Sequence, residues 1–210
     1  MSKFKILLVF GTRPEAIKMA PLVKVLQTSK NIEVRVCVTG QHKEMLEQVL
    51  KIYNIYPDYN LEIMSKNQTL SNITVKIING LEDVFKTFFP NLVLVHGDTT
   101  TALATALVSF YNKIEIGHVE AGLRTYNISS PFPEEANRQL ISKISKWHFA
   151  PTQTTYDNLI KESIDARSIL VSGNTVIDSL RLCLTYINGD NIKAYFKEEF
   201  KEILQKKYIL

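Results

Sequence analysis

Short apolar runs alternate along the chain with longer segments whose apolar residues recur every three or four positions. The runs lie at 4–10, 33–39, 61–64, 92–96, 115–119, 147–150 and 168–172. Most segments between them have the i, i+3, i+4, i+7 spacing of a helix with one apolar face. Runs that are apolar at nearly every position are typical of strands buried on both faces of a sheet. The pattern therefore predicts an α/β fold, a Rossmann-like parallel sheet with helices on both faces.

Three of the predicted helices have a well-defined apolar face. They lie at 43–53, 69–89 and 99–111. After the first strand, Met19, Val23 and Leu26 form a further helical face. Pro21 lies inside this segment and predicts either a fresh helix start or a kink.

The domain unit is predicted to span residues 1–187, because no repeat, linker or low-complexity stretch interrupts the alternation before that point. Asn188-Gly189-Asp190 is a turn signal. The helix-like sequence that follows predicts a linker helix at 188–210, leading toward a second domain.

Composition and charge are those of an ordinary globular protein, with 45% hydrophobic residues, 22% charged residues and a net charge of +4 among 210 residues. Neither a signal peptide nor an apolar run long enough to span a membrane is evident, so we expect a cytoplasmic protein without a membrane partner. Lysines near the end of the chain alternate with glutamates, which predicts a solvated helix face and no nucleic-acid partner. Cys37 and Cys183 lack C-x-x-C spacing and are expected to be reduced thiols, with no metal site.

Arg13 and Lys18 follow the first predicted strand, which ends at Phe10. Ligands of open parallel sheets bind at the carboxyl ends of the strands. The arginine fork suits a phosphate, and Lys18 adds a mobile charge near a helix start, where backbone N–H groups also favour anions. The two residues therefore predict an anion site. The structural alternative is that Arg13 pairs with a carboxylate at the sheet edge and Lys18 is solvated.

Three acidic residues, Asp98, Glu120 and Glu134, are expected near the same edge. Carboxylates held close together cannot all ionise easily, so one is expected to have a raised pKa suited to proton transfer. Asp98 could instead cap the helix that begins at Thr99, and Glu134 could interact with the dipole of its own helix. Glu120 could pair with Arg124.

Three histidines lie near these positions. His96 and His118 each precede one of the carboxylates by two residues and could orient it or a substrate. A satisfied structural histidine is more common at a strand end, so both are interpreted as supporting residues. His42 follows the second strand and is expected in a neighbouring loop.

Several motifs of other enzyme classes do not occur in the sequence. There is no G-x-G-x-x-G motif and no G-x-x-x-x-G-K-[ST] motif, so the sequence indicates neither a nicotinamide cofactor nor P-loop chemistry. There is also no G-x-S-x-G elbow and no metal-ligand spacing. We therefore expect no cofactor.

Six segments occur in order between residues 10 and 180: "FGTRPEAIKMAPL", "VTGQHKEML", "LVLVHGDTTTALA", "GHVEAGLRT", "SPFPEEANRQL" and "SGNTVIDSL". Together they resemble the non-hydrolysing UDP-N-acetylglucosamine 2-epimerases of bacteria. This resemblance implies the N-terminal half of a GT-B type two-domain fold, in which the sugar nucleotide lies between two Rossmann-like halves.

The resemblance also implies an activity, the interconversion of UDP-GlcNAc and UDP-ManNAc through elimination of UDP to a glycal and its re-addition, without a nicotinamide or a metal. The catalytic residues that it implies are Asp98, Glu120 and Glu134. The substrate-binding residues that it implies are Arg13, Lys18, His118 and Arg138.

Regulation and assembly are implied as well. Gln41 and His42 match a loop that contacts a second, activating UDP-GlcNAc molecule in some members of the family. Asn67 departs from the arginine of some regulated members, so allosteric activation is not implied for this chain. A homodimer formed through the first domain is expected.

The length of the sequence leads to the last expectation. The UDP-binding second domain of the family would begin near residue 210, so the chain is expected to be a half with little activity alone. Other readings remain open: a hydrolysing 2-epimerase that releases free ManNAc, an epimerase of a diacetamido UDP-sugar, or a non-catalytic module that binds a sugar nucleotide or a partner chain.

Overall fold

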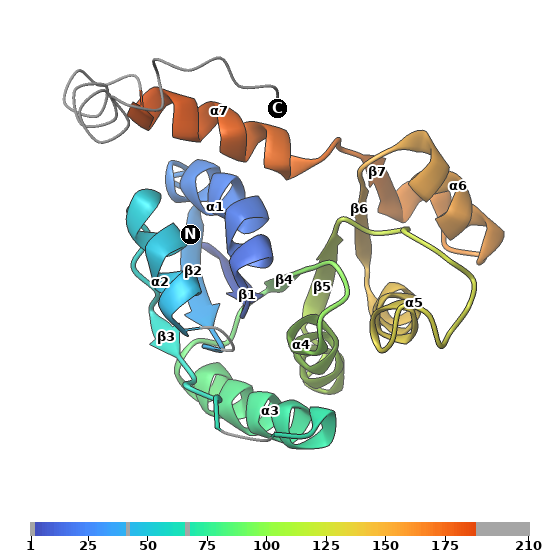
Figure 1. Ribbon diagram of the computed structural model, residues 1–210, viewed down its shortest axis with the longest axis horizontal. Coiled ribbons are helices and arrows are strands. Elements are labelled where there is room, and N and C mark those ends of the chain that lie inside the picture. Colours follow the sequence, from blue (N-terminus) through green and yellow to red (C-terminus); the bar gives the residue numbers. More distant parts are fainter. Residues whose placement is uncertain (1–2, 41–42, 66–67, 188–210) are drawn as a thin grey trace, which may run out of the picture.

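The computed structural model describes residues 3–40, 43–65 and 68–187 (Figure 1). The strands are β1 (Phe4–Phe10), β2 (Ile32–Val38), β3 (Tyr59–Asn60), β4 (Leu92–His96), β5 (Glu115–Val119), β6 (Trp147–Ala150) and β7 (Ile169–Val171). The helices are α1 (Arg13–Gln27), α2 (Lys43–Ile52), α3 (Leu70–Thr87), α4 (Thr100–Tyr111), α5 (Glu134–Ile144), α6 (Gln153–Lys161) and α7 (Thr175–Ile187), with a short 3-10 helix at Ala166–Ser168.

The strands form one sheet in the order β3-β2-β1-β4-β5-β6-β7, and every neighbouring pair is parallel. Strand order reverses at β1, which pairs with β2 on one side and β4 on the other. In sheets of this kind, ligands bind at the carboxyl ends of the strands that flank such a reversal. The predicted parallel sheet is confirmed.

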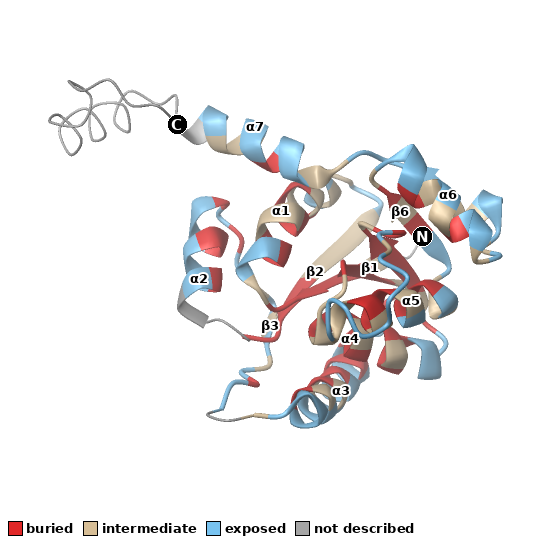
Figure 2. Cartoon of the chain, turned by 45° about the vertical axis from the view of Figure 1, so that its right-hand side comes forward, coloured by how far each residue is buried: buried red, intermediate tan, exposed pale blue. Residues whose placement is uncertain are grey.

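Helices cover both faces of the sheet, as the apolar runs predicted. Along β1, Leu7 and Val9 pack into a core shared with α3, α4 and α5, whereas Ile6, Leu8 and Phe10 pack into a core shared with α1, α2 and α7. This alternation follows from the two-residue period of a strand. Figure 2 shows the resulting layer of buried strand residues between helices whose outer faces are exposed.

Two local predictions are wrong. The third strand is Tyr59–Asn60 and not 61–64, because Glu62 adopts a φ of 46°, which no extended strand residue has. Amide hydrogen bonds of Leu61 and Ile63 to the backbone of β2 and the residue after it continue beyond the strand, but in irregular geometry. Of the two alternatives for Pro21, the fresh helix start is wrong, since α1 runs through it from Arg13 to Gln27, and the kink stays a prediction.

Some predictions fall outside the residues that the structure describes. They are Gln41, His42, Asn67 and the linker helix at 188–210. The domain boundary at residue 187 likewise stays a prediction. Across 3–40, 43–65 and 68–187, no helix is long and apolar enough to cross a membrane.

Candidate active site at the carboxyl ends of β1, β4 and β5

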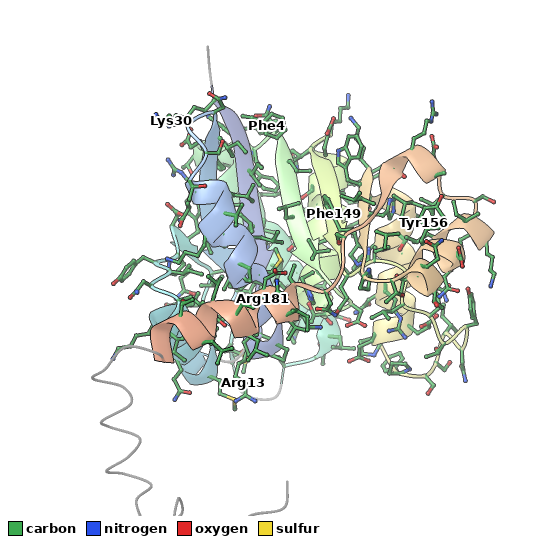
Figure 3. The ribbon with its side chains drawn as sticks, turned by 90° about the horizontal axis from the view of Figure 1, so that it is seen from above. Phe4, Arg13, Lys30, Phe149, Tyr156 and Arg181 are labelled. Atoms are coloured by element: carbon green, nitrogen blue, oxygen red, sulfur yellow. The ribbon has the colours of Figure 1, made fainter. Side chains whose placement is uncertain are left out.

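The predicted site residues gather where the sheet reverses its order. Asp98 and Glu120 lie in the loops after β4 and β5, Arg13 and Lys18 lie in the first two turns of α1, and Glu134 begins α5. Figure 3 shows Arg13 at the end of the molecule opposite Phe4 and Lys30, which lie near the amino ends of β1 and β2.

Glu120 lies at the centre of the contacts on this edge. Its Oε1 atom lies 2.5 Å from Nζ of Lys18 and accepts a hydrogen bond of 3.0 Å from Nδ2 of Asn174. Its backbone has a φ of 64°, a strained conformation for a residue with a side chain. The alternative of a merely solvated Lys18 is therefore wrong. The alternative pairing of Glu120 with Arg124 is wrong as well, since the Arg124 side chain forms hydrogen bonds of 2.6 and 2.8 Å to Glu162 instead.

Two buried histidines lie behind this carboxylate. Burial lowers the pKa of His96 to about 4, despite the neighbouring Glu120 charge, so the 3.6 Å approach of His96 Nε2 to Glu120 joins a neutral ring to a carboxylate. His118 Nε2 lies 2.7 Å from the carbonyl oxygen of Gly97. A carbonyl only accepts, so Nε2 carries the hydrogen. Burial lowers the pKa of His118 to about 3, and the neutral ring braces the turn before Asp98. Direct substrate binding by His118 stays a prediction.

Asp98 lies in the turn between β4 and α4. Its Oδ2 atom accepts a hydrogen bond of 3.1 Å from Arg138, and its backbone carbonyl accepts one of 2.8 Å from Asn137. Burial raises the pKa of Asp98 although Arg138 acts in the opposite direction, and the charges of Glu134 and Glu120 raise it further. The capping alternative is wrong, because Thr99 caps α4 by accepting from the amide of Ala102.

Glu134 is half-buried in the first turn of α5 and its charge acts on Asp98. Glu135, one residue later, was missed by the sequence analysis. It is fully buried and accepts hydrogen bonds from the amides of Thr125 and Tyr126 and from the side chains of Gln139 and Arg138. Glutamate side chains are rarely fully buried, so nothing in the sequence around Glu135 indicated that this one is. Glu135 thereby holds the guanidinium that reaches Asp98.

Glu15 was also missed, although its place three residues after Thr12 matches a capping box. Its Oε2 accepts from the amides of Gly11 and Thr12 at 3.0 and 2.8 Å, and its Oε1 accepts from the hydroxyl of Thr99 at 2.7 Å. Only 2% of the residue is exposed. Glu15 therefore ties the loop after β1 to the start of α4.

Replacing Glu15 with glutamine tests this arrangement. Burial raises the pKa of Glu15 above its ordinary value of 4.5, so the charged form of Glu15 destabilises the folded protein. This loss of stability grows as the pH rises above about 4.5. The amide oxygen of the glutamine side chain would accept from the two N–H groups, and its NH₂ would donate to Thr99. We expect Glu15→Gln to be at least as stable as wild type at pH 7, with an advantage that shrinks toward pH 4.

Glu15→Ala is the contrasting variant. It leaves two buried N–H groups and a hydroxyl without their acceptor, and we expect it to cost about 2 kcal/mol or more. Urea unfolding at several pH values measures both variants. If the glutamine and alanine variants lost equal stability, Glu15 would not act as a hydrogen-bond acceptor that a neutral amide can replace.

Arg13 is exposed at the start of α1 and has no hydrogen bond or ion pair with the part of the chain that the structure describes. Its guanidinium is thus available to a ligand, and the alternative pairing with a sheet-edge carboxylate is not found there. Among the same residues, no group of three or more His, Cys, Asp or Glu side chains is placed to hold a metal ion.

Together, the fold and this edge define one Rossmann-like half of a GT-B type fold, with carboxylates and cations gathered at the carboxyl ends of its strands. Residues 24–210 match the model of the family described as UDP-N-acetylglucosamine 2-epimerase. The chain belongs to this family.

Relatives and solved structures agree with this assignment. The chain is 54% identical to the UDP-N-acetylglucosamine 2-epimerase of Campylobacter jejuni, over 98% of this chain and 55% of that protein. The crystal structure of the Neisseria meningitidis enzyme bound to UDP-GlcNAc is similar with a TM-score of 0.90 at 54% identity, over 94% of this chain and 53% of that one. The structure of the Methanocaldococcus jannaschii enzyme in complex with UDP-GlcNAc and UDP is similar with a TM-score of 0.84 at 37% identity, over 93% of this chain and 54% of that one. The chain thus spans about half the length of these relatives.

Proposed function

We propose that this chain is the N-terminal half of a UDP-N-acetylglucosamine 2-epimerase that interconverts UDP-GlcNAc and UDP-ManNAc. The observation that carries the proposal is the placement of Asp98, Glu120 and Glu134 at the edge where Lys18 and Arg138 also lie. Family membership and the sugar nucleotides bound to the two solved relatives support it.

The proposed reaction needs proton transfer at C2 of the sugar and departure of a charged group at C1. A base removes the C2 proton, the electron pair forms a C1–C2 double bond, and the C1–oxygen bond breaks to release UDP. Re-addition returns UDP to C1 while an acid delivers a proton to the opposite face of C2. Only the configuration at C2 changes, so no oxidant or reductant is consumed.

The residues of the edge suit these steps. Arg13 and Lys18 lie near the positive end of α1 and are proposed to stabilise the diphosphate as it departs. The carboxylates are proposed to move the C2 proton. Asp98, whose pKa is raised, can carry a proton nearer to neutral pH than an ordinary aspartate. Arg138 is proposed to bind substrate in addition to holding Asp98, and His118 to support the site from behind.

Transfer of deuterium to C2 tests the proposal. UDP-GlcNAc is followed in D₂O by proton NMR with the 210-residue chain, and with residues 1–187 fused to the second half of the Neisseria meningitidis relative. We expect deuterium at C2 and formation of UDP-ManNAc from the fusion, and little from the chain alone, because contacts to the leaving group contribute to the transition state. Glu120→Gln in the fusion is expected to lower kcat about 100-fold or more.

Glu33→Gln is the matched control, since Glu33 lies at the opposite end of the sheet and pairs with Arg35 on the surface. It should leave turnover unchanged. Release of UDP with free ManNAc would favour a hydrolysing epimerase, and full turnover by the isolated chain would contradict the proposal that it is a half. Binding without any reaction would favour a non-catalytic module.

We further propose that the protein forms a homodimer in the cytoplasm and binds neither nucleic acid nor membrane. The resemblance to the family and the mild net charge of +4 support this proposal. The mass of the chain in solution, measured by light scattering, tests the dimer.

A further inference from the structure

Helix α7 crosses over α1 (Figures 1 and 3). The residue before α7, Asn174, contacts Glu120 of the candidate site. Leu182 and Cys183 on the inner face of α7 pack on the core that α1 and α2 share. A hollow of about 540 Å³ lies beside the contact. The hollow is lined in part by Pro21, Lys24, Val25, Thr28, Asp178 and Arg181. Hydrogen bonds to the elements beneath it also help to fix the position of the helix.

One such hydrogen bond depends on Pro21. In an α-helix the N–H of each residue donates to the carbonyl four residues earlier, and proline has no N–H. The carbonyl of Ile17 in α1 therefore lacks its helical donor. The hydroxyl of Ser179 in α7 donates to it at 2.6 Å, and the hydroxyl of Tyr53 lies 2.5 Å from the Ser179 oxygen. Ser179 is 1% exposed, so water does not replace this bond.

Asn174 is held at both ends of its amide group. Its Oδ1 accepts from the backbone N–H of Val176 in the first turn of α7, at 3.0 Å. Since that oxygen faces an N–H donor, the NH₂ group is turned toward Glu120, and Nδ2 donates to Oε1 at 3.0 Å. The amide is thus a rigid extension of α7, whereas Lys18, which contacts the same oxygen, has a flexible stem.

We propose that Asn174 is a positioning residue for Glu120, and that the Ser179–Ile17 hydrogen bond, which Pro21 makes necessary, holds α7 where Asn174 can reach that carboxylate. The proposal rests on the proposed function only in taking Glu120 to act in the reaction. Glu120 needs such support because its backbone is strained at a φ of 64° and its second contact is a mobile lysine. Pro21 lies in α1, Ser179 lies in α7 and Asn174 directly precedes α7, so the contact between the two helices connects all three to Glu120.

A double-mutant cycle with the 210-residue chain tests the helix contact. Ser179→Ala should lower the urea midpoint of unfolding, because it leaves the partly buried carbonyl of Ile17 without its donor. In a Pro21→Ala background the new N–H of residue 21 can donate to Ile17, so the same substitution should lower the midpoint by clearly less. Ser109→Ala is the control, since Ser109 donates at 2.7 Å to the Thr105 carbonyl, which already has its helical donor. Equal losses in the two backgrounds would overturn this part of the proposal.

Carbon-13 NMR of the Glu120 carboxyl group tests the positioning. In protein labelled at glutamate Cδ, Glu120→Gln assigns the resonance. Asn174→Ala should move it, and Ser179→Ala should move it in the same direction or broaden it. Asn112→Ala is the control, because Asn112 also donates through its side-chain amide, at 2.9 Å, but to the carbonyl of Val108 at the C-terminal end of α4. A resonance that stays in place in Asn174→Ala would overturn the proposal.

Both measurements are made without substrate, so they separate the two proposals. A shifted Glu120 resonance together with a failed deuterium assay would count against the proposed reaction and support the positioning. In the active fusion, Asn174→Ala should lower kcat about tenfold with KM nearly unchanged, because Asn174 contacts the catalytic carboxylate and not the substrate. An unchanged kcat there would overturn the role of Asn174 in the reaction.

Discussion

Gly122→Ala is expected to destabilise the protein by about 4 kcal/mol, a large part of the roughly 5–15 kcal/mol typical of folded proteins. Gly122 lies two residues after Glu120, in the loop between β5 and α5, and has a φ of +91°. A Cβ atom there would lie 2.2 Å from the backbone oxygen of Thr155 and 2.8 Å from its carbon. The strained φ costs roughly 1–3 kcal/mol, and the clash with helix backbone, which cannot rotate away, costs a similar amount.

Gly173→Ala is the matched control for this prediction. Gly173 also has a positive φ, of +79°, but a Cβ atom there would meet nothing within 4 Å. We expect it to cost only about 1 kcal/mol, the penalty of the left-handed conformation by itself. Urea unfolding measures both variants. Similar losses at the two glycines would show that the close approach of the Glu120 loop to α6 does not limit the fold.

Glu135→Ala is the second substitution with a large expected effect, about 3–5 kcal/mol of stability, because it removes one partner of a buried ion pair. The carboxylate is fully buried and lies 2.5 Å from Nη2 of Arg138. Without it, the guanidinium keeps only Asp98, and the amides of Thr125 and Tyr126 lose their acceptor. The loop before α5 is therefore expected to loosen together with the site.

The adjacent glutamate provides the control. Glu134 is half-buried at the start of α5 and has no side-chain hydrogen bond with the described part of the chain. Glu134→Ala should cost less than about 1 kcal/mol, the value of a carboxylate near a helix N-terminus. It should nevertheless abolish deuterium transfer in the fusion. Of the two neighbouring glutamates, Glu134 would then be needed for the reaction and Glu135 for stability. Equal losses of stability in the two alanine variants would contradict this assignment.

The pH dependence of stability gives an independent test of Glu135. Burial acts to raise its pKa, but hydrogen bonds from Thr125, Gln139 and Arg138 outweigh burial and lower the pKa to about 2, from 4.5. Its contribution is therefore complete above about pH 5 and is lost as the pH falls toward 2. Glu135→Ala should flatten this part of the acid unfolding profile. A profile with the wild-type slope would contradict the low pKa.

Much of the fold followed from local patterns. The apolar runs predicted β1, β4, β5 and β6 at their observed bounds and β2 and β7 to within one residue at each end, because strands buried on both faces of a sheet are apolar at most positions. The strand predicted at 61–64 was wrong for a physical reason, because an apolar run contains no information about the positive φ that Glu62 adopts. Helix periodicity likewise placed α2, α3 and α4 to within one or two residues at each end.

The candidate site was predicted only in part. Chemical type and position at strand ends were sufficient to select Lys18, Asp98 and Glu120, and the parallel sheet brings their loops to one edge. Their partners could not be predicted, because Lys18 and Glu120 are 102 residues apart and Arg138 and Asp98 are 40 apart. Sequence patterns that span only a helical turn carry no information about such pairs.

The sequence by itself determined the succession of strands and helices along the chain, the family that the six segments resemble, and the residue types available for proton transfer. Tertiary structure alone decided which charges meet. It buried Glu135 beside Arg138 while leaving Glu134 open, and it brought Ser179 to the carbonyl that Pro21 leaves free. The physical reason is the same in each case: burial and hydrogen bonding depend on the neighbours that folding brings from distant parts of the chain.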